Sequence, residues 1–315
     1  MSVVSVAAAV GCATLIGADF DGAHVGDDAS TDSTPLDAEP DAVLGDAPTL
    51  ADVGPVDLNA VGDLQLWLAA NDGVVTTPDP DAGPPPPVDA GDGAVGPPFD
   101  AGQAPANAIR RWSDLSLHGH DATQNDGVRR PTLVPDGLAG MPVVHFQRTR
   151  QTCLRATWAG GLTGKAATVF VVTRGDPTSL VRFQGGLTPG AFVFPHNSKY
   201  FVDASPELNV LLYNPPEQRL VRVDHDESAW QVSTTRVVVD TFGGVETWRN
   251  GLLSEKSSFF VPALPNVDVL GIGCYAVGIA ELADADVAEI LFYGSELSDA
   301  SRVAVEHYLQ SKWKL

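Results

Sequence analysis

The first 109 residues contain neither lysine nor arginine, although they hold 18 of the 40 acidic residues of this 315-residue chain. Their formal charge is −18, whereas residues 110–315 hold 22 acidic and 19 basic residues and carry only −3. Phosphate repels an acidic segment of this kind, and the near-neutral remainder has no basic stripe in its sequence. The composition therefore argues against nucleic acid as a partner.

Cysteine is scarce, and the first of the three cysteines, Cys12, lies in a short apolar segment at the start of the sequence. Residues 1–16 are small and apolar, but a helix that crosses a bilayer takes about 20 residues. The tripeptide Ala-Val-Gly before Cys12 resembles a bacterial lipobox, in which the cysteine is acylated. We therefore expect residues 1–12 to be a signal segment with lipidation at Cys12. An ordinary export signal with an incidental cysteine is the alternative.

Residues 13–60 lack the apolar content of a folded domain. They are mainly Asp, Ala, Thr, Pro and Gly, and Phe20 is their one aromatic residue. Such a segment buries too little apolar surface to offset the entropy lost on folding, and its like charges keep it extended. The sequence predicts a disordered acidic stalk in the cell envelope, which lifts the rest of the chain off the outer membrane or cell surface. Secretion is the alternative.

The other two cysteines, Cys153 and Cys274, are a candidate disulfide pair. Export to an oxidising compartment would permit this bond, which closes a long loop and stabilises a fold by about 2 to 4 kcal/mol. The spacing neither requires nor forbids it. The alternative is that each cysteine is a small buried apolar side chain.

After Trp112 the sequence predicts many short β-strands separated by turns. The segments are rich in β-branched and aromatic residues and are bounded by Gly, Pro, Asn and Asp. The expected strands are 168–174, 180–183, 191–194, 209–213, 219–224, 235–242 and 287–293. Asn250-Gly251 predicts a tight hairpin, because both central positions of a type I′ turn need a positive φ.

One helix is predicted, at the C-terminal end of the sequence. Ser298 is suited to cap it and Asp299 to occupy its first turn, where the helix dipole favours a carboxylate. Its expected apolar face comprises Val303, Ala304, Tyr308, Leu309 and Trp313. Many strands, one terminal helix and no alternation of strands with helices argue for an antiparallel sandwich, with the helix packed on a sheet.

A proline-rich stretch at residues 78–105 separates the apolar run 64–69 from Trp112. It repeats Asp-Ala-Gly and contains four consecutive prolines, which favours an extended and solvated protrusion. Six residues of strand cannot form a domain alone, and the cost of closing a loop rises only logarithmically with its length. We therefore expect one domain at 61–315 with a disordered insertion at 76–108. A linker between two domains is the alternative.

Five segments together resemble the concanavalin A-like, laminin-G-like jelly-roll domains of bacterial surface proteins. They are LQLWLAANDGV, RRWSDLSLHGHDATQ, RPTLVPDGLAGMPVVHF, TWRNGLLS and the C-terminal VAEILFYGSELSDASRVAVEHYLQSKWKL. The last is the most specific, because a strand, Leu-Ser-Asp and a helix that ends in Tyr-Leu-x-x-Lys-Trp occur in a fixed order. The resemblance implies an all-β fold: an antiparallel jelly-roll β-sandwich with one C-terminal helix.

Known catalytic motifs are absent from the sequence. Glucanases of this architecture carry Glu-x-Asp-x-x-Glu on one strand, which sets two carboxylates on the same face. The one Glu-x-Asp, at Glu39 and Asp41, lies in the expected stalk and is followed by Leu44. The sequence also lacks Gly-x-Ser-x-Gly and His-Glu-x-x-His. It therefore favours a non-catalytic protein over a glycosidase whose carboxylates would come from different strands.

Two groups of residues are candidate metal ligands. Asp224-His225-Asp226-Glu227 gathers three carboxylates, and domains of the resembling family often hold calcium through loop oxygens, so Asp224 and Asp226 are the calcium candidates. Consecutive residues of a strand alternate between faces, which makes a solvated turn the alternative. His118 and His120 are the second candidate pair.

Tryptophan raises the possibility of sugar binding, because an aromatic face matches the apolar face of a pyranose ring. Three of the six tryptophans lie in the resembling segments and are expected in the core: Trp67, Trp112 and Trp313. Three others lie near expected loops and are the candidate ligand-binding residues: Trp158, Trp230 and Trp248. For each of these, half-buried packing is the alternative.

The sequence favours an exported surface lipoprotein whose jelly-roll module binds a glycan or an extracellular matrix polymer without catalysis. This function rests on analogy at the level of the fold. No organic cofactor is expected, calcium is the candidate ion, and the only membrane contact expected is through the lipid anchor of a monomer. A structural or adhesion module that binds protein is the second interpretation, and a glycosidase is the third.

Overall fold

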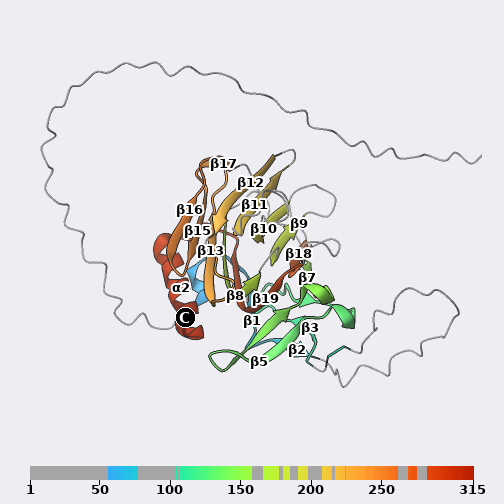
Figure 1. The fold of residues 1–315 in the computed structure, drawn as a ribbon. Coiled ribbons are helices and arrows are strands. Elements are labelled where there is room, and N and C mark those ends of the chain that lie inside the picture. Colours follow the sequence, from blue (N-terminus) through green and yellow to red (C-terminus); the bar gives the residue numbers. More distant parts are fainter. Residues whose placement is uncertain are drawn as a thin grey trace, which may run out of the picture. The chain divides into compact units, whose positions relative to one another are not determined.

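The chain folds into two large antiparallel β-sheets (Figure 1). The computed structural model describes residues 56–76, 104–105, 107–157, 166–176, 180–184, 191–197, 208–214, 217–223, 225–261, 269–274 and 282–315. All of them belong to one compact unit, Ala51–Leu315. The predicted fold class, an all-β antiparallel jelly-roll sandwich with a C-terminal helix, is confirmed.

Sheet I has eight strands. In spatial order they are β16 (Leu252–Lys256), β15 (Val245–Arg249), β13 (Gln231–Val237), β8 (Ala167–Asp176), β19 (Asp284–Tyr293), β6 (Met141–Phe146) and β5 (Thr132–Leu138), with β1 (Leu64–Ala69) also paired to β19. The first part of β19 pairs with β6 and its second part with β1, so the first and last described strands are neighbours in one sheet.

Sheet II has nine strands. In spatial order they are β12 (Glu217–Val223), β11 (Leu208–Asn214), β10 (Ala191–Asn197), β9 (Val181–Gln184), β18 (Val269–Ile272), β7 (Leu154–Thr157), β4 (Ala122–Thr123), β3 (Ile109–Trp112) and β2 (Val74–Thr76). A separate two-stranded sheet pairs β14 (Thr241–Phe242) with β17 (Phe260–Val261), and two short 3-10 helices lie at Gly127–Arg129 and Arg148–Arg150.

The main core lies between the two sheets. It includes Leu66, Val169, Val171, Ile290 and Phe292 of sheet I and Ile109, Trp112, Leu154, Val181 and Ile272 of sheet II. Successive residues of a strand point to opposite faces of its sheet. In β8, Val169 and Val171 therefore face sheet II, while Phe170 and Val172 face the other way and belong to a second core.

The second core lies between sheet I and two helices, α1 (Leu58–Val61) and α2 (Asp299–Trp313). Figure 1 shows α2 beside β13 and β15 of sheet I. Ser298 caps α2 by accepting a hydrogen bond from the backbone N–H of Ser301 at 3.1 Å, and Asp299 occupies the first turn, as predicted. Because sheet I is covered on both faces, β8 is apolar along most of its length. Among the described residues, no helix is long and apolar enough to cross a membrane.

The buried face of α2 differs from the predicted one. Val303 and Ala304 are only half-buried, whereas Arg302 and Glu306 are 7% and 2% exposed. The two charged side chains are buried because they pair with each other, Arg302 Nη1 lying 2.6 Å from Glu306 Oε2, and because Thr234 donates to Glu306 at 2.7 Å. A pattern of apolar residues cannot reveal a face that is partly made of paired charges.

Most predicted strands are confirmed. Six of them fall on β8, β9, β10, β11, β12 and β19, and the hairpin at Asn250-Gly251 has the expected positive φ values of 49° and 85°. The prediction of one strand over 235–242 was wrong. β13 ends at Val237, and the chain turns through Asp240, whose φ is 53°, before β14 begins.

Strands on both sides of the proline-rich stretch are neighbours in sheet II. Val74 of β2 stands opposite Trp112 of β3, and the two strands run antiparallel. The intervening residues 77–103 lie outside the described residues, as do the signal segment, its Cys12 and the expected stalk up to residue 55. The chain therefore leaves sheet II after β2 and returns to the next strand of the same sheet.

A disulfide joins the two cysteines of the candidate pair. Cys153 immediately precedes β7, and Cys274 follows β18, the neighbouring strand of sheet II. Their Cα atoms are 5.4 Å apart, and both side chains are buried. The bond thus connects positions 121 residues apart in the sequence within one region of the sheet.

Candidate functional site

A polar pocket of about 480 Å³ opens where β2, β3 and β4 form one end of sheet II. Its lining residues are Val75, Arg110, Arg111, Asp121, Thr123 and Asn125. Ligand pockets are commonly of this size, but most are lined mainly by apolar side chains. This pocket instead offers guanidinium, carboxylate, hydroxyl and amide groups, which suit a ligand rich in hydroxyl groups or charge.

Both arginines reach the pocket because β3 contains a β-bulge. In the pairing with β2, Ile109 and Arg111 have opposite residues, whereas Arg110 has none. Ile109 and Trp112 are fully buried, and the two arginines between them are exposed. Regular alternation would direct one of two consecutive side chains into the core. The extra residue of a bulge re-aims its neighbours, so both guanidinium groups face the same pocket.

A row of side chains crosses three neighbouring strands at the pocket. Arg111 of β3 stands opposite Thr123 of β4, and Thr123 stands opposite Arg155 of β7. Directly opposite residues place their side chains on the same face of a sheet. With strands spaced about 4.8 Å apart, the Cα atoms of the two arginines are roughly 10 Å apart. The arginine-bearing surface therefore continues beyond the pocket along the face of sheet II.

The turn that carries Asn125 is held by hydrogen bonds from its neighbours. Gln124 donates from Nε2 to the carbonyl oxygen of Cys153 at 2.9 Å, which links the turn to the disulfide-bearing strand. The Oε1 atom of Gln124 accepts from the backbone N–H of Asp126 at 3.0 Å. Arg130 donates to the carbonyl oxygens of Gln124 and Asn125 at 2.9 and 3.1 Å. These bonds fix one wall of the pocket.

Several charged side chains lie in and beside the pocket. Arg110 and Arg111 line it, Arg155 extends its row, and the guanidinium of Arg130 lies against the turn at its wall. Burial and the positive charge of Arg110 lower the pKa of Arg130. Asp121 is the one carboxylate among the lining residues, and its Oδ2 lies 3.8 Å from Arg111 Nε in an exposed and therefore weak pair.

Trp248 was wrongly predicted as a ligand-binding candidate. Its side chain is only 5% exposed. The guanidinium groups of Arg236 and Arg302 lie over the indole, 5.1 and 4.3 Å from the ring centroid. Because Arg302 belongs to α2, the helix covers this part of sheet I and leaves the ring no open face for a sugar.

Trp230 is half-buried, and Trp158 lies outside the described residues. The ring of Trp230 packs against the second core, and the Arg174 guanidinium lies 5.1 Å from its centroid. Sugar binding at these two residues stays a prediction. Of the tryptophans expected in the core, Trp112 and Trp313 are fully buried and Trp67 is half-buried.

The calcium candidates are only partly described, because Asp224 lies outside the described residues. Asp226 accepts hydrogen bonds from the backbone N–H of Ser228 at 2.9 Å and from its hydroxyl at 2.6 Å, which is the geometry of a turn. Within the described part of the chain, no three His, Cys, Asp or Glu side chains are grouped to hold a metal ion. Calcium at Asp224 and Asp226 stays a prediction.

The second candidate metal pair lies in the loop before β4. The rings of His118 and His120 stack in parallel with centroids 6.0 Å apart. His120 Nδ1 lies 3.2 Å from the carbonyl oxygen of Thr157, and the following Asp121 accepts a hydrogen bond from the backbone N–H of Asp114 at 2.9 Å. These contacts organise the loop.

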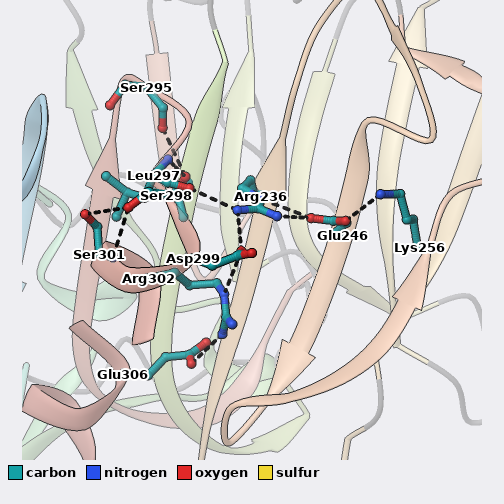
Figure 2. Close-up of polar contacts among 11 residues, drawn as sticks. Arg236, Glu246, Lys256, Ser295, Leu297, Ser298, Asp299, Ser301, Arg302 and Glu306 are labelled. Atoms are coloured by element: carbon teal, nitrogen blue, oxygen red, sulfur yellow. Dashed lines mark hydrogen bonds and ion pairs between the residues drawn. The ribbon is translucent and has the colours of Figure 1, made fainter. Parts of the chain in front are cut away.

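The half-buried Glu246 of sheet I and the buried Glu306 of α2 are engaged in contacts that hold the fold together. Figure 2 shows Glu246 of β15 between Arg236 and Lys256, which stand opposite it on the two neighbouring strands. Figure 2 also shows Glu306 paired with Arg302 on α2. A carboxylate that is already paired with a guanidinium is poorly suited to serve as a catalytic acid.

The residues of the pocket were not predicted from the sequence as a site. The four arginines come from three separate segments, so no basic stripe is visible along the chain. Arg110 and Arg111 are the first basic residues of the sequence and directly precede a buried tryptophan, which was the one available signal. The bulge that makes both face outward depends on the pairing with β2.

No protein-family model matches the sequence, and no curated protein sequence matches it. Among solved structures, the chain is similar to domain 4 of AbnA, an extracellular arabinanase from Geobacillus stearothermophilus, in complex with arabinotriose. The TM-score is 0.45 at 11% identity, over 62% of this chain and 92% of that one.

Two further solved structures are similar over about half of their own length. The binding domain of Paraclostridial Mosquitocidal Protein 1 has a TM-score of 0.45 at 10% identity, over 66% of this chain and 50% of that one. An arabinofuranosidase complexed with arabinofuranosyl-alpha-1,2-xylobiose has a TM-score of 0.46 at 13% identity, over 65% and 51%. At these values the similarities assign neither a family nor a ligand to this chain.

Proposed function

We propose that this protein is a carbohydrate-binding module that holds its ligand in the pocket of sheet II without catalysing a reaction. The observation that carries the proposal is the β-bulge at Arg110, which turns two consecutive arginines toward one pocket that also contains Thr123 and Asn125. Sugar hydroxyls both donate and accept hydrogen bonds, and this lining provides both kinds of partner.

A glycan array tests this function directly. The full chain is screened against neutral and acidic polysaccharides, with and without calcium, and thermal stability is followed in parallel. Thr123→Trp fills the row between Arg111 and Arg155, and we expect it to abolish binding. Thr241→Trp places the same bulk on an exposed strand outside the pocket, and we expect it to bind like the wild type. Absence of binding by a well-folded wild type would instead favour a module that binds protein.

The proposal includes a place in the cell for this module. It is a lipoprotein of the cell envelope, anchored at the outer membrane or cell surface through lipid on Cys12 and raised from it by the acidic segment between Cys12 and α1. The small apolar segment before the cysteine supports the anchor, and the like charges of the acidic segment after it support an extended stalk. Cys12→Ala should abolish labelling by a radioactive fatty acid and release the protein from membranes; unchanged retention would contradict the anchor.

A further inference from the structure

The disulfide residue Cys153 is bonded through its backbone to both ends of the turn that carries Asn125. Its N–H donates to the carbonyl oxygen of Arg129 at 2.9 Å, and its carbonyl oxygen accepts from Nε2 of Gln124 at 2.9 Å. Asn125, which lines the pocket, lies between these two attachments in the sequence. The position of Cys153 therefore sets the position of this wall of the pocket.

Gln124 extends the connection to β3. Its backbone N–H donates to the carbonyl oxygen of Arg110 at 2.9 Å, and Arg110 is the residue of β3 that has no opposite residue on β2. Its Oε1 accepts from the backbone N–H of Asp126 at 3.0 Å. A displacement of Cys153 is thus transmitted through one glutamine to Asn125 and Arg110, two residues that line the pocket.

The disulfide holds Cys153 where the backbone pairing of its strand has ended. The pairing of β7 with β18 ends at Leu154 and Ile272, one residue short of Cys153. The ends of a strand open more readily than its centre. Cys274 follows β18, so the disulfide extends the connection between the two strands beyond their last pair.

From these contacts we infer that the disulfide controls ligand binding. The pocket of sheet II has an ordered wall and binds its glycan tightly only in the oxidised protein, in which Cys153 is joined to Cys274. The reduced protein keeps the sandwich but loses the fixed positions of Asn125 and Arg110, and groups that must be ordered on binding give a lower affinity. The inference rests on the proposed function and adds the regulation of the same pocket.

Thiol–disulfide exchange with a small-molecule or protein disulfide forms this bond. The thiolate of one cysteine attacks the oxidant, whose S–S bond breaks with release of one thiol; the other cysteine then attacks the mixed disulfide and releases the second thiol. The two cysteines lose two electrons and two protons, which the oxidant gains. Cys153 and Cys274 are 1% and 0% exposed, so these reagents reach them only while the chain is open. The compartment in which the chain folds therefore sets the state of the pocket.

Hydrogen–deuterium exchange of the full chain without ligand tests the effect on the pocket wall. In the double variant Cys153→Ala and Cys274→Ala, the amides of Gln124 and Asp126 should exchange about ten-fold faster than in the wild type, because the residue that anchors their turn is released. Glu289→Gln breaks a buried ion pair beneath α2 at a comparable cost in stability and should leave both rates unchanged. Faster exchange in both variants would show general destabilisation and would overturn the inference.

Calorimetry with the glycan that the wild type binds most tightly on the array measures the effect on affinity. Well below the unfolding midpoints, the double cysteine variant should bind it about ten-fold more weakly, whereas Glu289→Gln should bind like the wild type. Wild type refolded in dithiothreitol should bind as weakly as the double variant, and refolding with oxidised glutathione should restore the affinity. Full affinity of the reduced protein would contradict the regulation.

Gln124→Ala removes the connection while the disulfide stays intact. It should weaken binding about ten-fold and should add no further loss in the double cysteine variant, because both changes remove the same connection. Gln65→Ala removes a glutamine of β1 whose side chain donates to Asp63, and it should bind like the wild type. Additive losses from Gln124→Ala and the cysteine substitutions would mean that the disulfide acts by another route, and the inference would be wrong.

The behaviour of the wild type separates this inference from the function beneath it. Glycan binding that is equal in the wild type and the double cysteine variant would overturn the regulation and leave carbohydrate binding intact. A folded and oxidised wild type that binds no glycan on the array would contradict the proposed function, and the regulation of binding with it.

Discussion

The carboxylate of Glu289 accepts a hydrogen bond from the indole Nε1 of Trp313 at 2.7 Å, although both side chains are fully buried. Three more groups converge on the same carboxylate: the indole of Trp67 at 2.7 Å, the hydroxyl of Tyr308 at 3.2 Å and the ammonium of Lys312 at 2.8 Å. The donors come from β1 and α2, so one side chain of β19 ties the N-terminal strand of the domain to the C-terminal helix.

Replacing Glu289 with glutamine should destabilise the protein strongly. The amide would turn an NH₂ group toward buried donors and leave Lys312 without a counter-charge, and breaking a buried pair in this way costs about 3 to 5 kcal/mol. Urea unfolding of Glu289→Gln measures the loss. Glu296→Gln, at an exposed position just before α2, removes the same charge and should change the free energy of unfolding by less than about 0.5 kcal/mol.

Stability should depend on pH through His145. Its Nδ1 lies 2.8 Å from Oδ1 of Asp286, whose other oxygen accepts from Arg174 at 2.7 Å. The hydrogen bond with Asp286 raises the pKa of His145 above its usual 6.5, against the opposing effect of burial. A raised pKa means that the folded protein binds this proton more tightly than the unfolded chain, so the stabilisation is fully present below pH 6.5 and is lost as the pH rises through the folded pKa.

Urea unfolding at several pH values across this range measures whether the stabilisation by His145 falls as the pH rises. The free-energy difference between wild type and His145→Gln should be largest near pH 5.5 and should shrink toward pH 8.5. In an Asp286→Asn background the same substitution should have little effect at any pH, because the partner that raises the pKa of His145 is gone. A difference that grows with pH would contradict the account.

Reduction of the disulfide should lower stability. Cys153 and Cys274 close a loop of 121 residues, and loss of a native disulfide typically costs about 2 to 5 kcal/mol. The midpoint of thermal unfolding should therefore fall when reductant is added to the wild type. The double variant Cys153→Ala and Cys274→Ala should unfold at the lower midpoint with or without reductant. A wild-type midpoint insensitive to reductant in the unfolding experiment would count against the predicted cost.

Removal of residues 78–103 should leave the sandwich folded. β2 and β3 pair directly, and the described Pro105 accepts a backbone hydrogen bond from Ala108 at 2.9 Å, so the deletion stops short of these contacts. Closing a shorter loop should stabilise the domain by about 1 kcal/mol. Circular dichroism during heating should show a single cooperative transition. A broad or lost transition would show that the stretch is part of the fold and would contradict its assignment as an insertion.

Local features of the fold could be predicted from the sequence, because they depend on neighbouring residues. The Asn250-Gly251 turn needs two positive φ values, and Ser298 supplies an acceptor to the first turn of α2; both are properties of a few consecutive residues. A run of β-branched residues likewise predicts the strand β8, although only the structure shows that both of its faces are buried.

The site could not be predicted because it depends on contacts between distant segments. Arg110 faces outward only because β3 carries one residue more than the paired part of β2, and Arg155 joins the row only through β4. The position of Trp248 beside a turn suggests an accessible side chain. In the folded chain Arg302 of α2, more than fifty residues later in the sequence, covers its ring. Pairing register and helix docking are properties of the folded chain.

A crystal structure of the full chain with an oligosaccharide that binds on the glycan array would test the central claim most directly. The account predicts a sugar in the pocket of sheet II, with a sugar hydroxyl within hydrogen-bond distance of the side chain of Arg111 or Asn125. Density for the sugar at Trp230, or anywhere else away from this pocket, would contradict it.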